Sequence, residues 1–185
     1  MRTFRNWDQV KGALNGRGKL PPGGHVCKII KVEQKVGRKG GTLLSLWLDI
    51  DEGSQHDGRG MEEYTRRVNA GKNAFCPYIM WINVYGENMQ PSQYFKGLIL
   101  QIEQDNPPYK WDGDEDKLVG KKVGAVFREK ELAGVDGNFF VTEPFAFCPV
   151  QDAPSVTPPE PLRMYRSNSS NRMGNLEPIG DEMPF

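Results

Sequence analysis

The chain has 185 residues, and its 24 basic and 24 acidic residues balance at neutral pH. This length suits one domain with a tail, because domains typically have about 100–150 residues. No apolar run approaches the roughly 20 residues that span a bilayer, and Met1–Val10 lacks the apolar stretch of a secretory signal. These features exclude a globally basic protein and predict a cytoplasmic protein with no membrane partner.

The first predicted elements are two strands that form a hairpin. Gly23-Gly24 precedes a strand over His25–Val36, and the glycine-rich turn Gly37–Gly41 connects it to a second strand over Thr42–Asp51. Alternation in the second strand predicts a core face made of Leu44, Leu46, Leu48 and Ile50. The opposite face, which we expect to be in solvent, has Ser45, Trp47, Asp49 and Asp51.

The next segment, Glu52–Asn73, is a long polar connection in which we expect a short helix over Met61–Val68. A third strand is predicted over Phe75–Tyr85, with a bulge or a sheet edge at Pro77. Its alternation places one set of side chains on the core face: Met80, Ile82 and Val84. The other face has Trp81, Asn83 and Tyr85.

An amphipathic helix follows the third strand. Its apolar side chains have the i, i+3, i+4, i+7 spacing of a helix that packs on a core, and they are Phe95, Leu98, Ile99 and Ile102. Pro91-Ser92 marks its start and Asn106–Pro108 its end. Two further strands are predicted over Lys121–Lys130 and Asn138–Phe147, with a turn at Asp136-Gly137.

The order of these elements, β-β-β-α-β-β, predicts a mainly β fold. It is the order of the five-stranded oligonucleotide-binding (OB) barrel, which has one helix between strands 3 and 4. We expect this domain over residues 20–148, after an N-terminal extension over 1–19. Residues 149–180 are rich in Pro, Ser and Asn and have no apolar period, so we expect a disordered linker before an acidic tip at 181–185.

The sequence lacks the usual patterns of catalytic sites. It has no phosphate-binding glycine loop and no nucleophile elbow, and its two histidines stand apart. The wide spacing of the three cysteines excludes a zinc site or a disulfide framework: Cys27, Cys76 and Cys148. Asp112–Asp116 departs from the calcium-loop pattern, and a metal nuclease built on Asp49, Asp51 and Glu52 would lack its paired lysine. We therefore expect no enzyme, no metal and no cofactor.

Basic and aromatic residues gather on the elements with which OB barrels bind single strands. Such sites combine a basic groove for phosphates with aromatic rings on which bases stack. The aromatic candidates are Trp47, Trp81 and Tyr85. The basic candidates are Lys28, Lys31, Lys35, Arg38 and Lys39 on the first hairpin and Arg66, Arg67 and Lys72 on the long connection. Ring packing, and a solvated edge strand protected by lysines, are the structural alternatives.

Two parts of the chain resemble known families. The end, Asp181-Glu182-Met183-Pro184-Phe185, resembles the acidic tip of bacterial single-stranded DNA-binding proteins, with two acids where that family often has three. Most of 20–140 resembles phage- and prophage-encoded early proteins that coat single strands. The shared patterns are Gly23-Gly24, Lys28–Glu33, Tyr94–Gly97, Asn106-Pro107, Tyr109–Asp112 and Leu118–Gly124. The stretch Gly53–Tyr78 matches no pattern of this kind.

These resemblances imply a protein that binds and protects single-stranded DNA during replication or recombination in a bacterium or a phage-infected host cell. They also imply that the tip, residues 181–185, recruits a replication or recombination protein. The alternative is a protein-interaction module, such as a host-takeover factor, that binds no nucleic acid. Whether the chain forms a homo-oligomer stays open.

Overall fold

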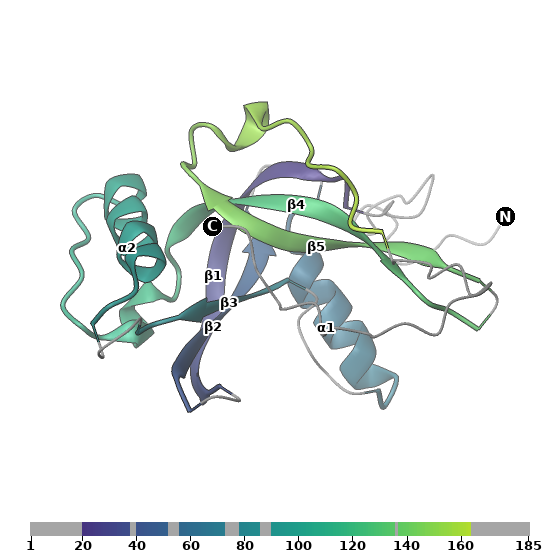
Figure 1. Ribbon diagram of the computed structural model, residues 1–185, viewed down its shortest axis with the longest axis horizontal. Coiled ribbons are helices and arrows are strands. Elements are labelled where there is room, and N and C mark those ends of the chain that lie inside the picture. Colours follow the sequence, from purple (N-terminus) through teal and green to yellow (C-terminus); the bar gives the residue numbers. More distant parts are fainter. Residues whose placement is uncertain are drawn as a thin grey trace, which may run out of the picture.

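Five antiparallel strands form a nearly closed barrel of the OB type (Figure 1). The computed structural model describes residues 20–37, 40–51, 56–72, 78–85, 90–135 and 137–163. The strands and α-helices are β1 (Gly23–Val36), β2 (Thr42–Ile50), α1 (Arg59–Asn69), β3 (Ile79–Asn83), α2 (Gln93–Asp105), β4 (Lys122–Leu132) and β5 (Phe139–Cys148). Two short 3-10 helices are η3 (Glu115–Leu118) and η4 (Ala153–Ser155). The predicted fold class and element order are confirmed.

The long strand β1 joins the two halves of the barrel. Its first part, Gly23–Lys28, pairs with β4, and from Cys27 onward it pairs with β2. The register with β2 shifts between Ile29 and Lys31, and an extra residue of this kind bends a strand. The sheet therefore runs in the order β3-β2-β1-β4-β5, and contacts between β3 and β5 bring its two ends together.

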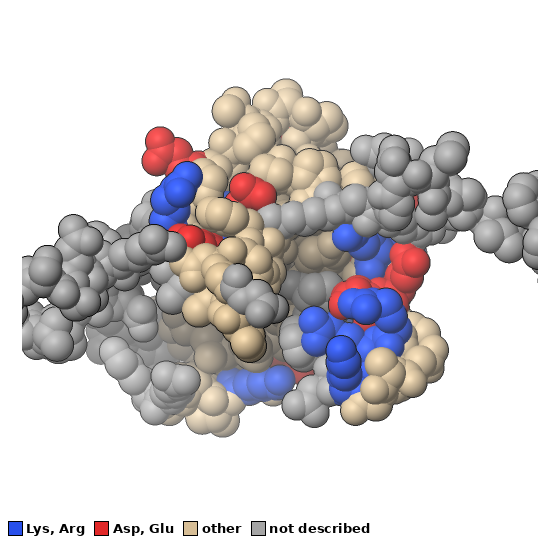
Figure 2. Space-filling view, turned by 90° about the vertical axis from the view of Figure 1, so that its right-hand side faces the viewer, with Lys and Arg blue, Asp and Glu red and all other residues tan. Residues whose placement is uncertain are grey.

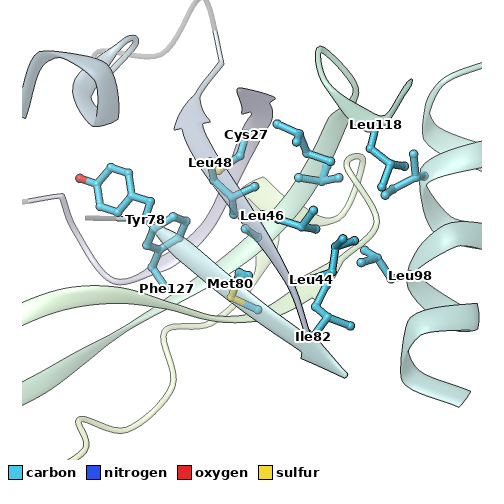
Figure 3. Packing of buried hydrophobic residues seen from close by; sticks show 14 of the residues in the cluster. Cys27, Leu44, Leu46, Leu48, Tyr78, Met80, Ile82, Leu98, Leu118 and Phe127 are labelled. Atoms are coloured by element: carbon cyan, nitrogen blue, oxygen red, sulfur yellow. The ribbon is translucent and has the colours of Figure 1, made fainter. Parts of the chain in front are cut away.

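The core has the residues that the sequence pattern predicts. The four alternating apolar side chains of β2 are buried, and so are the four on the predicted stripe of α2. In Figure 3 the side chains of β2 and β3 point toward Phe127 of β4 and toward α2. The Ser92 hydroxyl begins α2 by accepting a hydrogen bond from the Phe95 N–H at 3.0 Å. Burying each large apolar side chain contributes about 1.5–3 kcal/mol, so this core supplies most of the stability.

The prediction that one face of β2 lies in solvent is wrong. Ser45 is 0% exposed and Asp49 is 6% exposed, whereas Trp47 and Asp51 are half-buried. Ser45 is shielded because its small side chain lies in one cross-strand row between Glu33 and Trp81. Asp49 is buried because the first turn of α1 lies over it.

The described chain continues past residue 148, the expected end of the domain, as far as Arg163. Ala153 in η4 is fully buried, and its carbonyl lies so close to Gly24 that a Cβ there would be 2.0 Å from the oxygen. Leu162 then donates its N–H to Glu129 O at 2.8 Å and accepts from Glu131 N–H at 2.9 Å. β4 extends past its pairing with β1, so this segment satisfies backbone groups of β4 that β1 leaves unpaired.

The remaining part of the expected linker and the acidic tip, residues 164–185, lie outside the described residues, as does the extension over 1–19. The predicted helix near 61–68 is confirmed as α1. The third strand is described from Ile79, and the expected break at Pro77 lies outside the described residues. None of the described helices is long and apolar enough to cross a bilayer.

Candidate nucleic-acid interface

The sheet register brings basic and aromatic residues of three strands onto one surface, which we call the outer face. Lys31 of β1 lies opposite Trp47 of β2, and Trp47 lies opposite Ile79 of β3. The next row across β1, β2 and β3 consists of Glu33, Ser45 and Trp81. The row after it consists of Lys35, Leu43 and Asn83. Because side chains alternate along a strand, all of these lie on the face opposite Leu44 and Leu46, although Ser45 is buried and Trp47 and Ile79 also pack against the core. The outer face therefore combines two indole rings with two lysines and one glutamate.

Each lysine of the outer face lies over an indole ring. The Lys31 Nζ atom is 4.6 Å from the centre of the Trp47 ring, and the Lys35 Nζ atom is 5.1 Å from that of Trp81. Both distances are within the roughly 6 Å at which an ammonium group is attracted to the negative face of a ring. The contacts fix each lysine beside an aromatic surface.

Glu33 connects the two lysines. Its carboxylate is 2.6 Å from Lys31 Nζ and 3.4 Å from Lys35 Nζ. The hydrogen bond from Lys31 holds the pKa of the Glu33 carboxyl below its usual value; desolvation opposes this effect, and the hydrogen bond from Lys35 adds to it. Glu33 was not among the predicted site residues. Its place between Lys31 and Lys35, two residues from each on one strand, is the pattern that would have indicated it.

The two indole rings differ in accessibility. Trp81 is 45% exposed. Trp47 is half-buried and packs on the core, with its ring centre 5.9 Å from that of Tyr64 on α1. The Trp47 Nε1 atom is buried and has no hydrogen-bond partner among the described residues. Trp81 therefore offers the accessible stacking surface, whereas Trp47 has the packing role that was the structural alternative for these rings.

The remaining candidates of the first hairpin and of β3 lie at the margins. Tyr85 is exposed just after β3, where its backbone forms a bridge with Pro91. Lys28 is exposed near the middle of β1, opposite Asp49 and across the register shift from Lys31. Arg38 and Lys39, at the hairpin tip, lie outside the described residues.

The basic residues of the long connection belong to α1 and the turn after it. Arg66 and Arg67 both bind the Glu63 carboxylate, with nitrogen–oxygen distances of 2.5 and 3.1 Å. Together with Arg59 they line a cavity of about 400 Å³ between α1 and β5. Figure 2, which views the molecule from its α1 side, shows Lys and Arg gathered there with acidic side chains among them. Lys72 is exposed just beyond the helix. These residues form a mixed-charge surface beside the outer face.

Asp49 positions α1 against β2. Its carboxylate accepts the N–H groups of Gly60 at 2.6 Å, Ile50 at 2.9 Å and Met61 at 3.2 Å, in place of an N-cap side chain that Gly58 cannot supply. A Cβ at Gly60 would lie 2.9 Å from this carboxylate, so only glycine allows the approach. Burial raises the pKa of Asp49 above its usual value, although the three N–H groups oppose the rise.

No protein-family model and no curated protein sequence matches the chain. Among the described residues, no group of three or more His, Cys, Asp or Glu side chains is arranged to hold a metal ion. The fold and the outer face are therefore the two observations from which a function can be inferred.

Proposed function

We propose that the protein binds single-stranded DNA on the outer face of β1, β2 and β3. The observation that carries this proposal is Trp81, a large ring that is 45% exposed on the barrel surface with Lys35 against it. In OB barrels this surface, with the loops beside it, is where oligonucleotides lie. A base stacked on Trp81 would contribute about 1–3 kcal/mol, and the neighbouring lysines would contact phosphates.

A preference for single strands follows from the chemistry of the outer face. Stacking on an indole ring requires a base whose own face is free, and a duplex keeps its bases stacked on each other. Stacking on one ring is also tolerant of sequence, since every base has a π-face. The protein would thus coat exposed strands during replication or recombination, the role that its sequence resemblances imply.

A titration with a fluorescent single-stranded oligonucleotide tests the proposal, with a duplex of equal length as the control. We expect tight binding of the single strand, weaker binding of the duplex, and a falling affinity as salt rises. With about three to five phosphates contacted, log K should fall against log salt with a slope of about −2 to −3.5. A flat salt response, or a preference for the duplex, would contradict the proposal. Absence of any binding would favour a protein-interaction module.

We also propose that Asp181–Phe185 recruits a replication or recombination protein. Its acids suit a basic rim, and the Phe185 ring can fill an apolar pocket within such a rim, as aromatic anchors do in small interfaces. The segment is anionic, so it has no attraction for phosphates. We expect removal of these five residues to abolish capture of the partner from a bacterial lysate while single-strand affinity stays unchanged or rises slightly at low salt.

Two controls sharpen the test of the tip. Phe185→Ala keeps the acids and should lose most of the capture, whereas a substitution in the preceding segment, such as Asn175→Ala, should keep it. Unchanged capture after the truncation would show that the tip has no recruiting role. Loss of single-strand binding after the truncation would show that the DNA site has been misplaced.

A further inference from the structure

Lys31 and Lys35 converge on a single anionic group. They are four residues apart on β1, which is about 13 Å along an extended strand. Their Nζ atoms nevertheless both reach the Glu33 carboxylate, at 2.6 and 3.4 Å. Two ammonium groups around one anion is the arrangement by which proteins hold a phosphate as well as a carboxylate. The outer face thus contains an anion site that is occupied by a side chain of the protein itself.

The same two lysines lie over the two indole rings of the outer face. Lys35 lies over Trp81 and Lys31 over Trp47. A nucleotide that stacks on the face of Trp81 beside Lys35 has to displace the Lys35 ammonium from the ring. The phosphate of this nucleotide must also replace the Glu33 carboxylate as the partner of the Lys35 ammonium. The two anions compete because the ammonium has a single positive charge.

We propose that the Glu33 carboxylate occupies the place of a strand phosphate between Lys31 and Lys35 and acts as a built-in competitor that limits the affinity of the outer face for single-stranded DNA. This inference rests on the proposed function and names the position of one phosphate in it. Glu33 lowers affinity through the lysines, and it is therefore a regulator of the site and not one of its ligands.

The surroundings of Glu33 hold it in this position. It lies within β1, paired with Ser45 of β2, whose hydroxyl donates to the Glu33 carbonyl at 3.3 Å. The flanking lysines hold the pKa of its carboxyl below the usual value, so the two ion pairs are present at neutral pH. Because the Glu33 backbone is fixed in the sheet between the two lysines, its carboxylate stays within reach of both, and an incoming phosphate competes with it.

Glu33→Gln tests the inference because it keeps the size of the side chain and removes its charge. We expect single-strand affinity to rise about fivefold at roughly 0.1 M salt for each lysine released, and the salt slope to steepen by about 0.7 per lysine. Glu115→Gln, the same change in η3 outside the outer face, should alter neither quantity. Thermal midpoints should stay close to that of the unsubstituted protein, because the ion pairs of Glu33 with Lys31 and Lys35 are partly exposed to solvent.

A protein without the two lysines shows whether Glu33 acts through them. If Glu33 competes for them, Glu33→Gln should have no effect in a protein that already has Lys31→Gln and Lys35→Gln. An equal gain in that background would show direct repulsion of the strand and would overturn the inference. An unchanged or weaker affinity of Glu33→Gln alone would also overturn it. If the unsubstituted protein binds no oligonucleotide, the proposed function itself fails, and that outcome is distinct from either of these.

Discussion

The two indole rings of the outer face lie on neighbouring strands in adjacent rows, yet they have different surroundings. Trp47 is covered on one side by Tyr64 of α1 and packs on the core. Trp81, one row away on β3, is 45% exposed. The helix between β2 and β3 thus divides one face of the sheet into a covered half and an open half. Strand alternation tells which face a residue is on, but an element inserted elsewhere in the chain decides whether that face meets solvent.

Asp49 and Glu33 show the same division for carboxylates. Asp49 lies in the covered half, where it holds the first turn of α1 through three backbone N–H groups. Glu33 lies in the open half, where it contacts two exposed lysines. One carboxylate therefore stabilises the fold and the other modulates a surface.

Substitution of the two tryptophans should affect the stability of the protein to different extents. Trp47→Ala removes a half-buried ring that packs on the core and on Tyr64, and we expect it to lower the free energy of unfolding by about 2–3 kcal/mol. Trp81→Ala should change it by less than about 0.5 kcal/mol. Chemical denaturation of both variants measures the difference. Equal losses would show that α1 does not divide the face as described.

Asp49→Ala should detach the start of α1 from β2. The substitution leaves three backbone N–H groups without their acceptor, and we expect a loss of about 1–2 kcal/mol in the free energy of unfolding. Glu33→Ala, which removes a carboxylate from the open half, should cost much less. Hydrogen exchange of the Gly60 and Met61 amides would locate the effect, and unchanged protection there would contradict the capping role.

The pH dependence of Asp49 provides a second readout. Burial raises its pKa in the folded protein, so the folded state binds this proton more tightly than the unfolded state does. The stability that this group contributes is therefore fully present below its unfolded pKa and is lost as pH rises through the folded pKa. The unsubstituted protein should gain stability relative to Asp49→Asn as pH falls from neutral through that window. A difference that does not vary with pH would show that the Asp49 pKa is unshifted.

The smallest expected effect concerns Lys35 in the open half. In a protein that already has Glu33→Gln, Lys35→Gln removes one released ammonium group beside Trp81, and we expect the slope of log K against log salt for a single strand to become shallower by about 0.7. Lys110→Gln, at an exposed ion pair with Glu103 outside the outer face, is the matched control and should keep the slope. Equal slopes for all three proteins would place the phosphates elsewhere.

The barrel could be predicted because its signals are local. The apolar alternation from Leu44 to Ile50 and the helical stripe of α2 depend only on neighbours in the chain, and both agree with the structure. The burial of Asp49 could not be predicted in this way, since it depends on how Gly60, eleven residues later, returns to β2. The packing of residues 149–163 was missed for a similar reason. A segment without apolar period is held there by backbone hydrogen bonds to β4, such as that from Leu162 to Glu129, which composition does not reveal.

The candidate site was predictable in outline. Strand alternation placed Trp81 away from the core, and the run of basic residues on β1 indicated Lys31 and Lys35. From the sequence, Trp47 and Trp81 were equivalent candidates, because each alternates with the apolar core residues of its strand. Only the position of α1 distinguishes them, and α1 lies in the stretch that matched no known pattern.

The most direct test of the central claim is the affinity of Trp81→Ala for a fluorescently labelled single-stranded oligonucleotide, measured by anisotropy together with the thermal midpoint of the same protein. Leu100→Ala, which shortens another exposed apolar side chain on α2, is the control. We predict that Trp81→Ala weakens binding by about 1–3 kcal/mol with its thermal midpoint nearly unchanged, and that Leu100→Ala binds like the unsubstituted protein. Unaltered affinity of Trp81→Ala would contradict single-strand binding on the outer face.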